Sequence, residues 1–341
     1  MRYPFALMLL LSAPLFGSTP VDWNAVTRLD APLPRISNDP AKAKGMLKNH
    51  LERQLETTER FLKEHPADPH GYDARVRIEV AKARIASLEG DPSGVGDSLN
   101  RLMRLEKEAP DPARKAETMF RRISLQWQNL GDTPDLRREN AVASAGRFAL
   151  EFPEDRRAPR LLAEAASLCD NHPEEKARLV DQALALSREE PLTKRLLDDR
   201  KRLDQLGKPV DLSFRGIDGR QVDLADCRGR VTALVFWSAE SAPSLVWMNY
   251  FRKFAEGVPG LSVITISLDT EENDLKAGMD SLGITSWPVN FDGKGWENAV
   301  ARRFGINSLP TLWLIDKQGR LQTLNARENY ENRIRELLLK N

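Results

Sequence analysis

The most constraining feature of this 341-residue sequence is an apolar run that breaks into a helical pattern. Residues 233–237 read ALVFW, a short polar turn follows, and apolar residues then recur at helical spacing. An apolar run without alternation is typical of a strand that is buried on both faces, as in a parallel sheet covered by helices. The sequence therefore predicts a buried strand at 231–237 and a helix at about 244–256.

The rest of the second half repeats this alternation. Two short extended runs flank Asp218-Gly219, which is a hairpin signal. Further strands are predicted at 261–269, 310–316 and 321–326, and further helices near 274–282, 296–304 and 328–340. Strands that alternate with helices predict a parallel core, with the hairpin and the last strand as antiparallel edges.

The first half contains a repeated hexapeptide of the form apolar-x-x-Glu-x-Pro. It occurs as FLKEHP at 61–66, LEKEAP at 105–110, FALEFP at 148–153 and LSREEP at 186–191. Between the copies the sequence has apolar residues at helical spacing. A proline ends one helix and the polar residues after it can cap the next, so each unit is predicted to be a helical hairpin stacked on its neighbours.

This layout resembles divergent tetratricopeptide-type repeats over residues 40–206. Repeat arrays of that kind imply a surface for a protein partner. The predicted fold class is therefore multidomain, with an all-α helical-hairpin repeat region at 40–206 followed by an α/β domain at 207–341.

The N-terminus has the layout of a secretory signal. Arg2 precedes an apolar run from Phe5 to Leu11, and the small residues Gly17 and Ser18 follow. Residues 1–19 are interpreted as a signal peptide and 20–39 as a linker. We expect export to the periplasm and, since no later stretch is long and apolar enough, no stable membrane span after cleavage.

Composition excludes several classes of function. A net charge of +1 with 30% charged residues argues against nucleic-acid binding. With only two cysteines the chain has neither a disulfide scaffold nor a Cys-rich metal site. All four histidines lie in the first half, where His65 and His70 are interpreted as solvated loop residues. No metal and no cofactor is predicted.

Ordered landmarks in the second half carry a family resemblance. They are the entry hairpin, Phe236-Trp237, Pro243 in the turn before the helix, and INSLPTLWLID near the end. Together they resemble exported thioredoxin-like proteins of the TlpA/redoxin type over about 207–341. The resemblance implies a thioredoxin-like fold in which Pro310 follows a cis peptide bond and faces the 241–244 turn.

This chain departs from that family at the residues that carry the family's redox chemistry. Its pattern places Cys-x-Pro-Cys where this chain has Ser241-Ala242-Pro243-Ser244. A thiol at a helix N-terminus ionises readily, whereas a serine hydroxyl stays protonated and forms no disulfide. A serine nucleophile would need a base, and the second half has no histidine. Ser241 and Ser244 are therefore interpreted as degenerate redox positions, one of them capping the helix.

Cys227 leaves an alternative open. It precedes the strand 231–237, whereas the serine turn follows it, so about 23 Å separates the two ends. Packing as a small hydrophobe is the favoured interpretation of Cys227. The alternative is a thiol–disulfide oxidoreductase or peroxidase that acts through this residue. A disulfide between Cys169 and Cys227 is a further possibility that the sequence does not decide.

What remains at this end of the domain is a predicted binding surface. In the family, the backbone beside the cis-proline pairs with an extended segment, so a protein or peptide partner is expected. The predicted binding residues are Trp237, Ala242, Pro243, Trp247, Trp287, Leu309 and Pro310. The favoured function is a non-catalytic binding or scaffolding module in the cell envelope, and a purely structural module is the third possibility.

Overall fold

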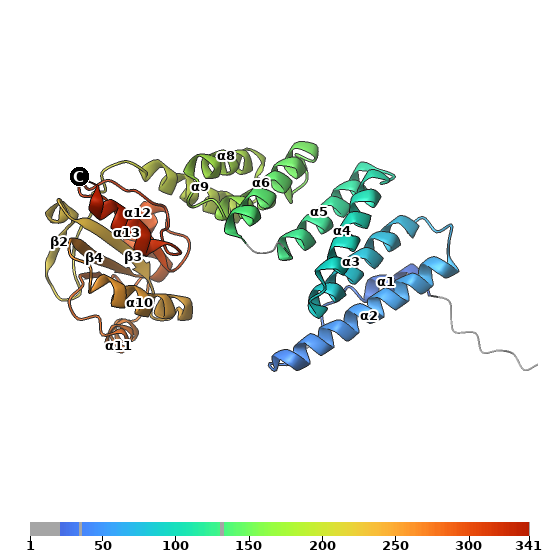
Figure 1. Cartoon of the computed structure of the whole chain (residues 1–341), viewed down its shortest axis with the longest axis horizontal. Helices are drawn as coiled ribbons and strands as arrows, with labels where there is room; N and C mark the ends of the chain where they lie inside the picture. Colours follow the sequence, from blue (N-terminus) through green and yellow to red (C-terminus); the bar gives the residue numbers. More distant parts are fainter. Residues whose placement is uncertain (1–20, 34–35, 130–132, 341) are drawn as a thin grey trace, which may run out of the picture. The chain divides into compact units, whose positions relative to one another are not determined.

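The computed structural model describes residues 21–33, 36–129 and 133–340. The chain divides into two compact units, Met1–Leu130 and Gly131–Asn341. Helices occupy the first part of the sequence and an α/β domain the last part, which confirms the predicted fold class (Figure 1). The predicted signal peptide, 1–19, lies outside the described residues, and the predicted domain boundary at 206/207 stays a prediction.

Five helices make up the described part of the first unit. They are α1 (Trp23–Arg28), α2 (Pro40–Glu64), α3 (Gly71–Glu89), α4 (Pro92–Lys107) and α5 (Pro112–Gln128). Asp39, Asp91 and Asp111 each cap the helix that begins at the next residue, a proline. The carboxylate accepts from free backbone N–H groups, and proline tolerates the first helical position because it has no N–H to satisfy. These Asp-Pro pairs therefore set where α2, α4 and α5 begin.

The segment predicted to be a linker, 20–39, contains α1. Val26 of this helix is buried with Phe61 and Ala74. Trp23 stacks on His70 with 4.6 Å between ring centroids. His70 is thus a half-buried loop residue whose ring packs on Trp23, so it is less solvated than the sequence interpretation implied. Among the described residues no group of three side chains is placed to hold a metal ion.

Four helices begin the second unit: α6 (Pro134–Glu151), α7 (Ala158–Ser167), α8 (Pro173–Leu186) and α9 (Glu190–Gln205). Neighbours along the chain pack together within each unit, α2 to α5 in the first and α6 to α9 in the second. The hexapeptide prolines lie just after α2, α4 and α6 and in the first turn of α9. Each interval between them therefore holds two helices, while the tetratricopeptide-like assignment stays a prediction.

Helix α9 also packs against the α/β domain within the second unit. It contacts α12 (Ala299–Phe304). The Asn307 side-chain amide donates to the Asp199 carboxylate at 3.2 Å. Asp199 also pairs with Arg202, and both of these side chains are buried. No helix among the residues described has the length and apolarity that a membrane span requires.

The α/β domain is built on a four-stranded sheet of order β5-β4-β3-β6. Its strands are β3 (Val231–Trp237), β4 (Leu261–Ser267), β5 (Val289–Asn290) and β6 (Thr311–Ile315). Strands β3, β4 and β5 are parallel, and β6 runs antiparallel to β3 at the edge. The predicted strand 231–237 is confirmed, as is the helix after it, α10 (Ala242–Ala255).

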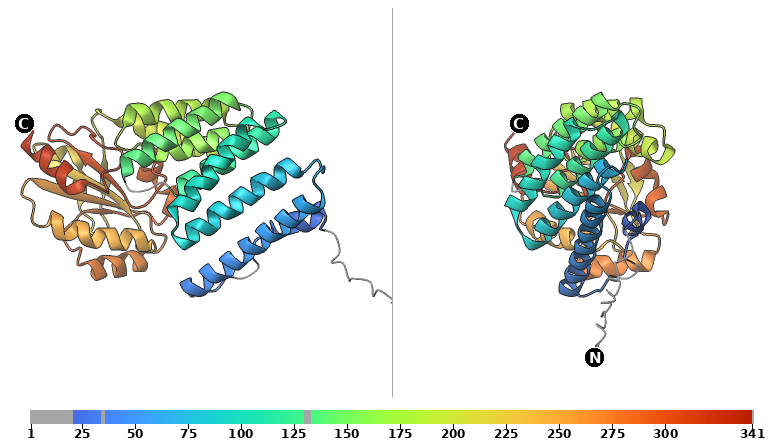
Figure 2. Two further views of the ribbon diagram at one scale, coloured as in Figure 1. Left: turned by 45° about the vertical axis from the view of Figure 1, so that its right-hand side comes forward. Right: turned by 90° about the vertical axis from the view of Figure 1, so that its right-hand side faces the viewer.

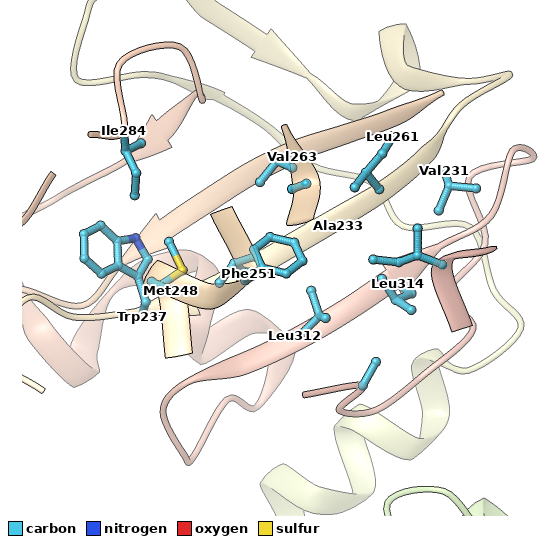
Figure 3. Packing of buried hydrophobic residues seen from close by; sticks show 14 of the residues in the cluster. Val231, Ala233, Trp237, Met248, Phe251, Leu261, Val263, Ile284, Leu312 and Leu314 are labelled. Atoms are coloured by element: carbon cyan, nitrogen blue, oxygen red, sulfur yellow. The ribbon is translucent and has the colours of Figure 1, made fainter. Parts of the chain in front are cut away.

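Helices cover both faces of this sheet. Alternate residues of β3, among them Ala233 and Trp237, pack with Met248 and Phe251 of α10 (Figure 3). The same face receives α11 (Glu272–Leu282) and α13 (Tyr330–Leu339), and Figure 2 shows α10 and α11 together on one side of the sheet. The other residues of β3 pack with α12 and the N-terminal hairpin. Burial on two faces is the physical reason for the unbroken apolar run in β3.

Two strand predictions need correction. The hairpin β1 (Ser213–Arg215) and β2 (Gln221–Asp223) forms its own two-stranded sheet and is not an edge of the main sheet. Residues 321–326 form only an isolated bridge, Ile315↔Leu321. The Thr323 and Asn325 side chains accept from N–H groups of β6, at 3.1 and 3.3 Å, so side-chain oxygens replace backbone partners there.

Candidate peptide-binding groove

A groove of about 520 Å³ lies where β3 and β4 end, and we call it the carboxyl-end groove. It is lined by Ser238, Glu240, Ser241, Leu268, Thr270, Lys294, Gly295, Trp296, Glu297, Asn307, Ser308 and Leu309. The carboxyl edge of parallel strands is where α/β domains place their ligands, because the loops after the strands converge there. The groove is therefore the candidate functional site.

A buried carboxylate organises one wall of the groove. Asp269 is fully buried and accepts hydrogen bonds from the hydroxyls of Ser238 and Ser267, each at 2.7 Å. It also accepts from the Glu240 N–H at 3.2 Å. Three donors around one buried carboxylate offset the cost of removing its charge from water. The loop between β3 and α10 is thereby anchored to the end of β4.

The two serines of the turn have different environments. Ser241 is the N-cap of α10, and its side chain accepts from the Ser244 N–H at 3.3 Å. Ser244 is fully buried, and its hydroxyl has no hydrogen-bond partner among the residues that the structure describes. Ala242 and Pro243 are exposed in the first turn of α10. The predicted capping role is thus filled by Ser241, and neither hydroxyl contacts a base.

We expect alanine at the two serines to have opposite effects on stability. Ser241→Ala removes the cap and lowers the free energy of unfolding by about 0.5–2 kcal/mol. Ser244→Ala removes a buried, unpaired hydroxyl, which costs about 1–3 kcal/mol to desolvate, so stability stays equal or rises. Urea unfolding of both variants measures the difference. A larger loss for Ser244→Ala than for Ser241→Ala would contradict this assignment.

The opposite wall carries the segment before β6. The Leu309–Pro310 peptide bond is cis, as predicted. Leu309 and Ser241 line the same groove, so this segment faces the serine turn. Pro310 itself is buried. Among the described residues, neither the N–H nor the C=O of Leu309 has a hydrogen-bond partner. Leu309, which lines the groove, therefore has a free backbone edge, that is, an unpaired N–H and C=O.

The predicted tryptophans do not gather at this groove. Trp237 is fully buried in the core, so the expectation of an exposed aromatic is wrong there. Trp247 is half-buried and stacks on Phe251 at 4.8 Å between centroids. Its indole N–H donates to the Arg327 C=O at 3.1 Å. Trp247 thus connects the C-terminal segment to α10 through this hydrogen bond. Tyr330 packs edge-on against Trp247, and burial raises the pKa of the Tyr330 hydroxyl.

Trp287 lies at a second cavity with Cys227. This cavity, of about 380 Å³, is lined by both residues and by the first residues of β4. The structure therefore brings Trp287 to the site of Cys227 and not to the serine turn. Cys227 is half-buried against the core on the hairpin side of the sheet. Its side chain packs there as the sequence interpretation predicted.

Neither cysteine is in a disulfide. Cys169 is fully buried, and its thiol donates to the Ala165 C=O at 3.3 Å. Burial raises the pKa of the Cys169 thiol to about 12, with a further contribution from the Glu175 carboxylate. The thiol form dominates at neutral pH, and Cys169 is a core residue of the helical region.

Sequence reasoning missed most of the lining residues, among them Thr270, Lys294, Trp296 and Asn307. Trp296 is 51% exposed, which makes it the exposed aromatic of this groove. It lies in a short 3₁₀ turn, Gly295–Glu297. The sequence interpretation placed it at the start of a helix, because only one residue with extended backbone, Asn298 (ψ 129°), separates this turn from α12. The Gly-Lys-Gly sequence before the tryptophan is typical of a turn and was the signal available in the sequence.

The sheet order, the antiparallel edge strand, the helices on both faces and the cis proline before β6 define a thioredoxin-like domain. Residues 207–324 match the model of the AhpC/TSA family. The C-terminal domain is accordingly a thioredoxin-like domain, and its sequence is similar to that family.

Curated proteins similar to the chain bear one name. The Thiol-disulfide oxidoreductase ResA of Bacillus thuringiensis (strain Al Hakam) is 29% identical over 140 residues, which cover 38% of this chain and 79% of that protein. The protein of the same name from Geobacillus thermodenitrificans is 24% identical over 116 residues, 33% of this chain and 64% of that protein.

Solved structures are similar over the same share of the chain. A thiol-disulfide oxidoreductase from Bacteroides fragilis aligns with a TM-score of 0.34 and 20% identity, over 38% of this chain and 98% of that one. The thioredoxin domain of a thiol-disulfide oxidoreductase from Bacteroides vulgatus aligns with a TM-score of 0.34 and 20% identity, over 39% and 97%.

Proposed function

We propose that this chain is an exported, non-catalytic binding protein whose thioredoxin-like domain holds an extended protein or peptide segment in the carboxyl-end groove. The observation that carries the proposal is the free backbone edge of Leu309, which faces Ser241 across the groove. An unpaired N–H and C=O at the margin of a groove offer an extended segment the hydrogen bonds of strand addition. Trp296, exposed at the same groove, adds apolar contact area.

The serines support the non-catalytic part of the proposal. Disulfide exchange requires a thiolate, and a hydroxyl at the same place does not ionise near neutral pH. Ser241 uses its oxygen as a helix cap, and the hydroxyl of Ser244 is enclosed by protein. In this proposal the two serines replace the redox cysteines of the family and keep the helix start that the fold needs.

Export to the periplasm rests on the first nineteen residues, which have a charged, an apolar and a small-residue segment in order. The alternative function, a thiol–disulfide oxidoreductase or peroxidase acting through Cys227, is favoured by the names of the similar curated proteins. Cys227 lies at the other cavity, away from the free edge of Leu309. That separation favours the binding role over the redox role.

A groove-filled variant tests the binding role. Thr270 is an exposed lining residue, and Thr270→Trp places a large side chain in the groove. We expect wild-type chain, immobilised and exposed to its native envelope fraction, to retain a partner that Thr270→Trp does not retain. Thr265→Ser, at a fully buried core position, serves as the control that keeps the partner. Equal recovery on wild type and Thr270→Trp would refute binding in this groove.

A further inference from the structure

A second groove lies on the first unit, among helices α2, α3 and α4. We call it the α2–α4 groove; its volume is about 640 Å³. It is lined by Glu59, Leu62, Lys63, Arg75, Ile78, Glu79, Lys82, Arg101, Arg104, Leu105 and Glu108. None of these residues belongs to the carboxyl-end groove, so the function proposed above does not account for them.

Charges in the α2–α4 groove are not balanced. Lys82 pairs with Glu59 at 3.1 Å, and Arg101 pairs with Glu79 at 3.3 Å. These two ion pairs use two of the five cations and two of the three anions of the lining. One anion, Glu108, is left without a described partner.

Three exposed cations remain: Lys63, Arg75 and Arg104. None of them has an ion-pair or side-chain hydrogen-bond partner within residues 21–33, 36–129 and 133–340. They come from three different helices, α2, α3 and α4. Positive charge from three directions therefore converges on one groove, and against Glu108 it leaves an excess of two.

The groove also has an apolar floor. Ile78 and Leu105 are buried, and Leu62 is half-buried beside them. Mixed apolar and cationic lining suits a ligand that carries both apolar side chains and carboxylates. Arginine guanidinium groups hold carboxylates through paired N–H donors, which gives such contacts direction as well as charge.

We propose that the α2–α4 groove binds an acidic segment of a partner protein, with its apolar side chains on Ile78 and Leu105 and its carboxylates on Arg75 and Arg104. The proposal is independent of the function assigned to the thioredoxin-like domain. It adds a second binding site, which prefers negatively charged ligands.

The test uses the full chain and a short fluorescein-labelled peptide in which glutamates alternate with leucines. Wild type is expected to bind this peptide more tightly than the same peptide with glutamines, and to lose affinity as salt is raised. In Lys63→Gln/Arg75→Gln/Arg104→Gln, three exposed charge contacts are removed. We expect affinity to fall about tenfold, which corresponds to about 1.4 kcal/mol.

A matched variant removes the same charge elsewhere on the same unit. Lys42, Lys44 and Arg53 are exposed cations in the first part of α2 that do not line the groove. The triple change of these residues to glutamine should leave affinity within about twofold of wild type, since distant surface charges are screened. An equal loss in both triple variants would overturn the proposal. So would equal binding of a short single-stranded DNA, which would show a general polyanion surface.

Discussion

The double variant Ser241→Cys/Ser244→Cys is expected to catalyse the reduction of insulin disulfides by dithiothreitol, whereas the wild-type chain is expected not to. Position 241 caps α10, a helix of 14 residues, where the helix dipole and free N–H groups stabilise a thiolate. Lowering a thiol pKa from about 8.5 to about 7 raises the thiolate fraction at pH 7 more than tenfold. We therefore expect turnover about tenfold above the uncatalysed rate.

The buried position 244 can accept the second thiol of the cysteine pair. Its hydroxyl has no partner, so a thiol there costs no hydrogen bond, and cysteine packs as a small hydrophobe. Ser244→Cys alone is the control, because it supplies a second thiol without the thiolate at the cap. A double variant that folds and shows no turnover would refute the claim that these serines occupy a redox site.

The wild-type arm of the same assay decides between the two candidate functions. Wild-type turnover that disappears in Cys227→Ser would support the redox alternative and refute the non-catalytic proposal.

Gly305→Ala is expected to destabilise the second unit by more than about 3 kcal/mol. Gly305 ends α12 with a positive φ of 68°, a region in which a residue with a Cβ costs about 1–2 kcal/mol. A Cβ at this position would also lie 2.5 Å from the Asp198 backbone oxygen on α9, and backbone atoms on both sides leave little room to relax. Thermal and urea unfolding, followed by circular dichroism, measure the loss.

Gly283→Ala is the matched control for this prediction. Gly283 ends α11 with nearly the same conformation, φ 66° and ψ 31°. A Cβ there meets nothing closer than 3.8 Å, so only the conformational cost of about 1–2 kcal/mol applies. The excess loss in Gly305→Ala measures the contact between α9 and the α/β domain. Equal losses in the two variants would show that α9 moves away from the added Cβ at no cost and would contradict the prediction.

Local patterns were sufficient to predict several elements of this fold. The apolar run at 233–237 led to a predicted strand at 231–237, and these are the bounds of β3, Val231–Trp237. The strand β5 was missed because Val289–Asn290 is too short to show a period. Residues 321–326 were predicted as a strand wrongly, since their alternation is real but Thr323 and Asn325 supply the hydrogen bonds from side chains. No pattern of hydrophobicity distinguishes those two kinds of partner.

The candidate site was also predictable only in part, because side-chain hydrogen bonds decide which of its residues are exposed. Ser241 and Leu309 were predicted to face one another through a family resemblance, and they line one groove. Trp296 was missed because its exposure depends on a turn held by Asn298 and Asp292. Asp292 accepts from the N–H groups of Lys294 and Ala299, at 3.1 and 3.0 Å. Asn298 is fully buried and caps α12.

Sequence alone determined which chemistry these positions can perform, because a hydroxyl or a thiol is a property of the residue and needs no neighbour. It also determined where helices α2, α4 and α5 begin, because the Asp-Pro pairs act within one turn. Only the tertiary structure decided that Trp237 is enclosed while Trp296 is exposed. Burial depends on which distant helices cover each face of the sheet, and those contacts join residues far apart in the chain.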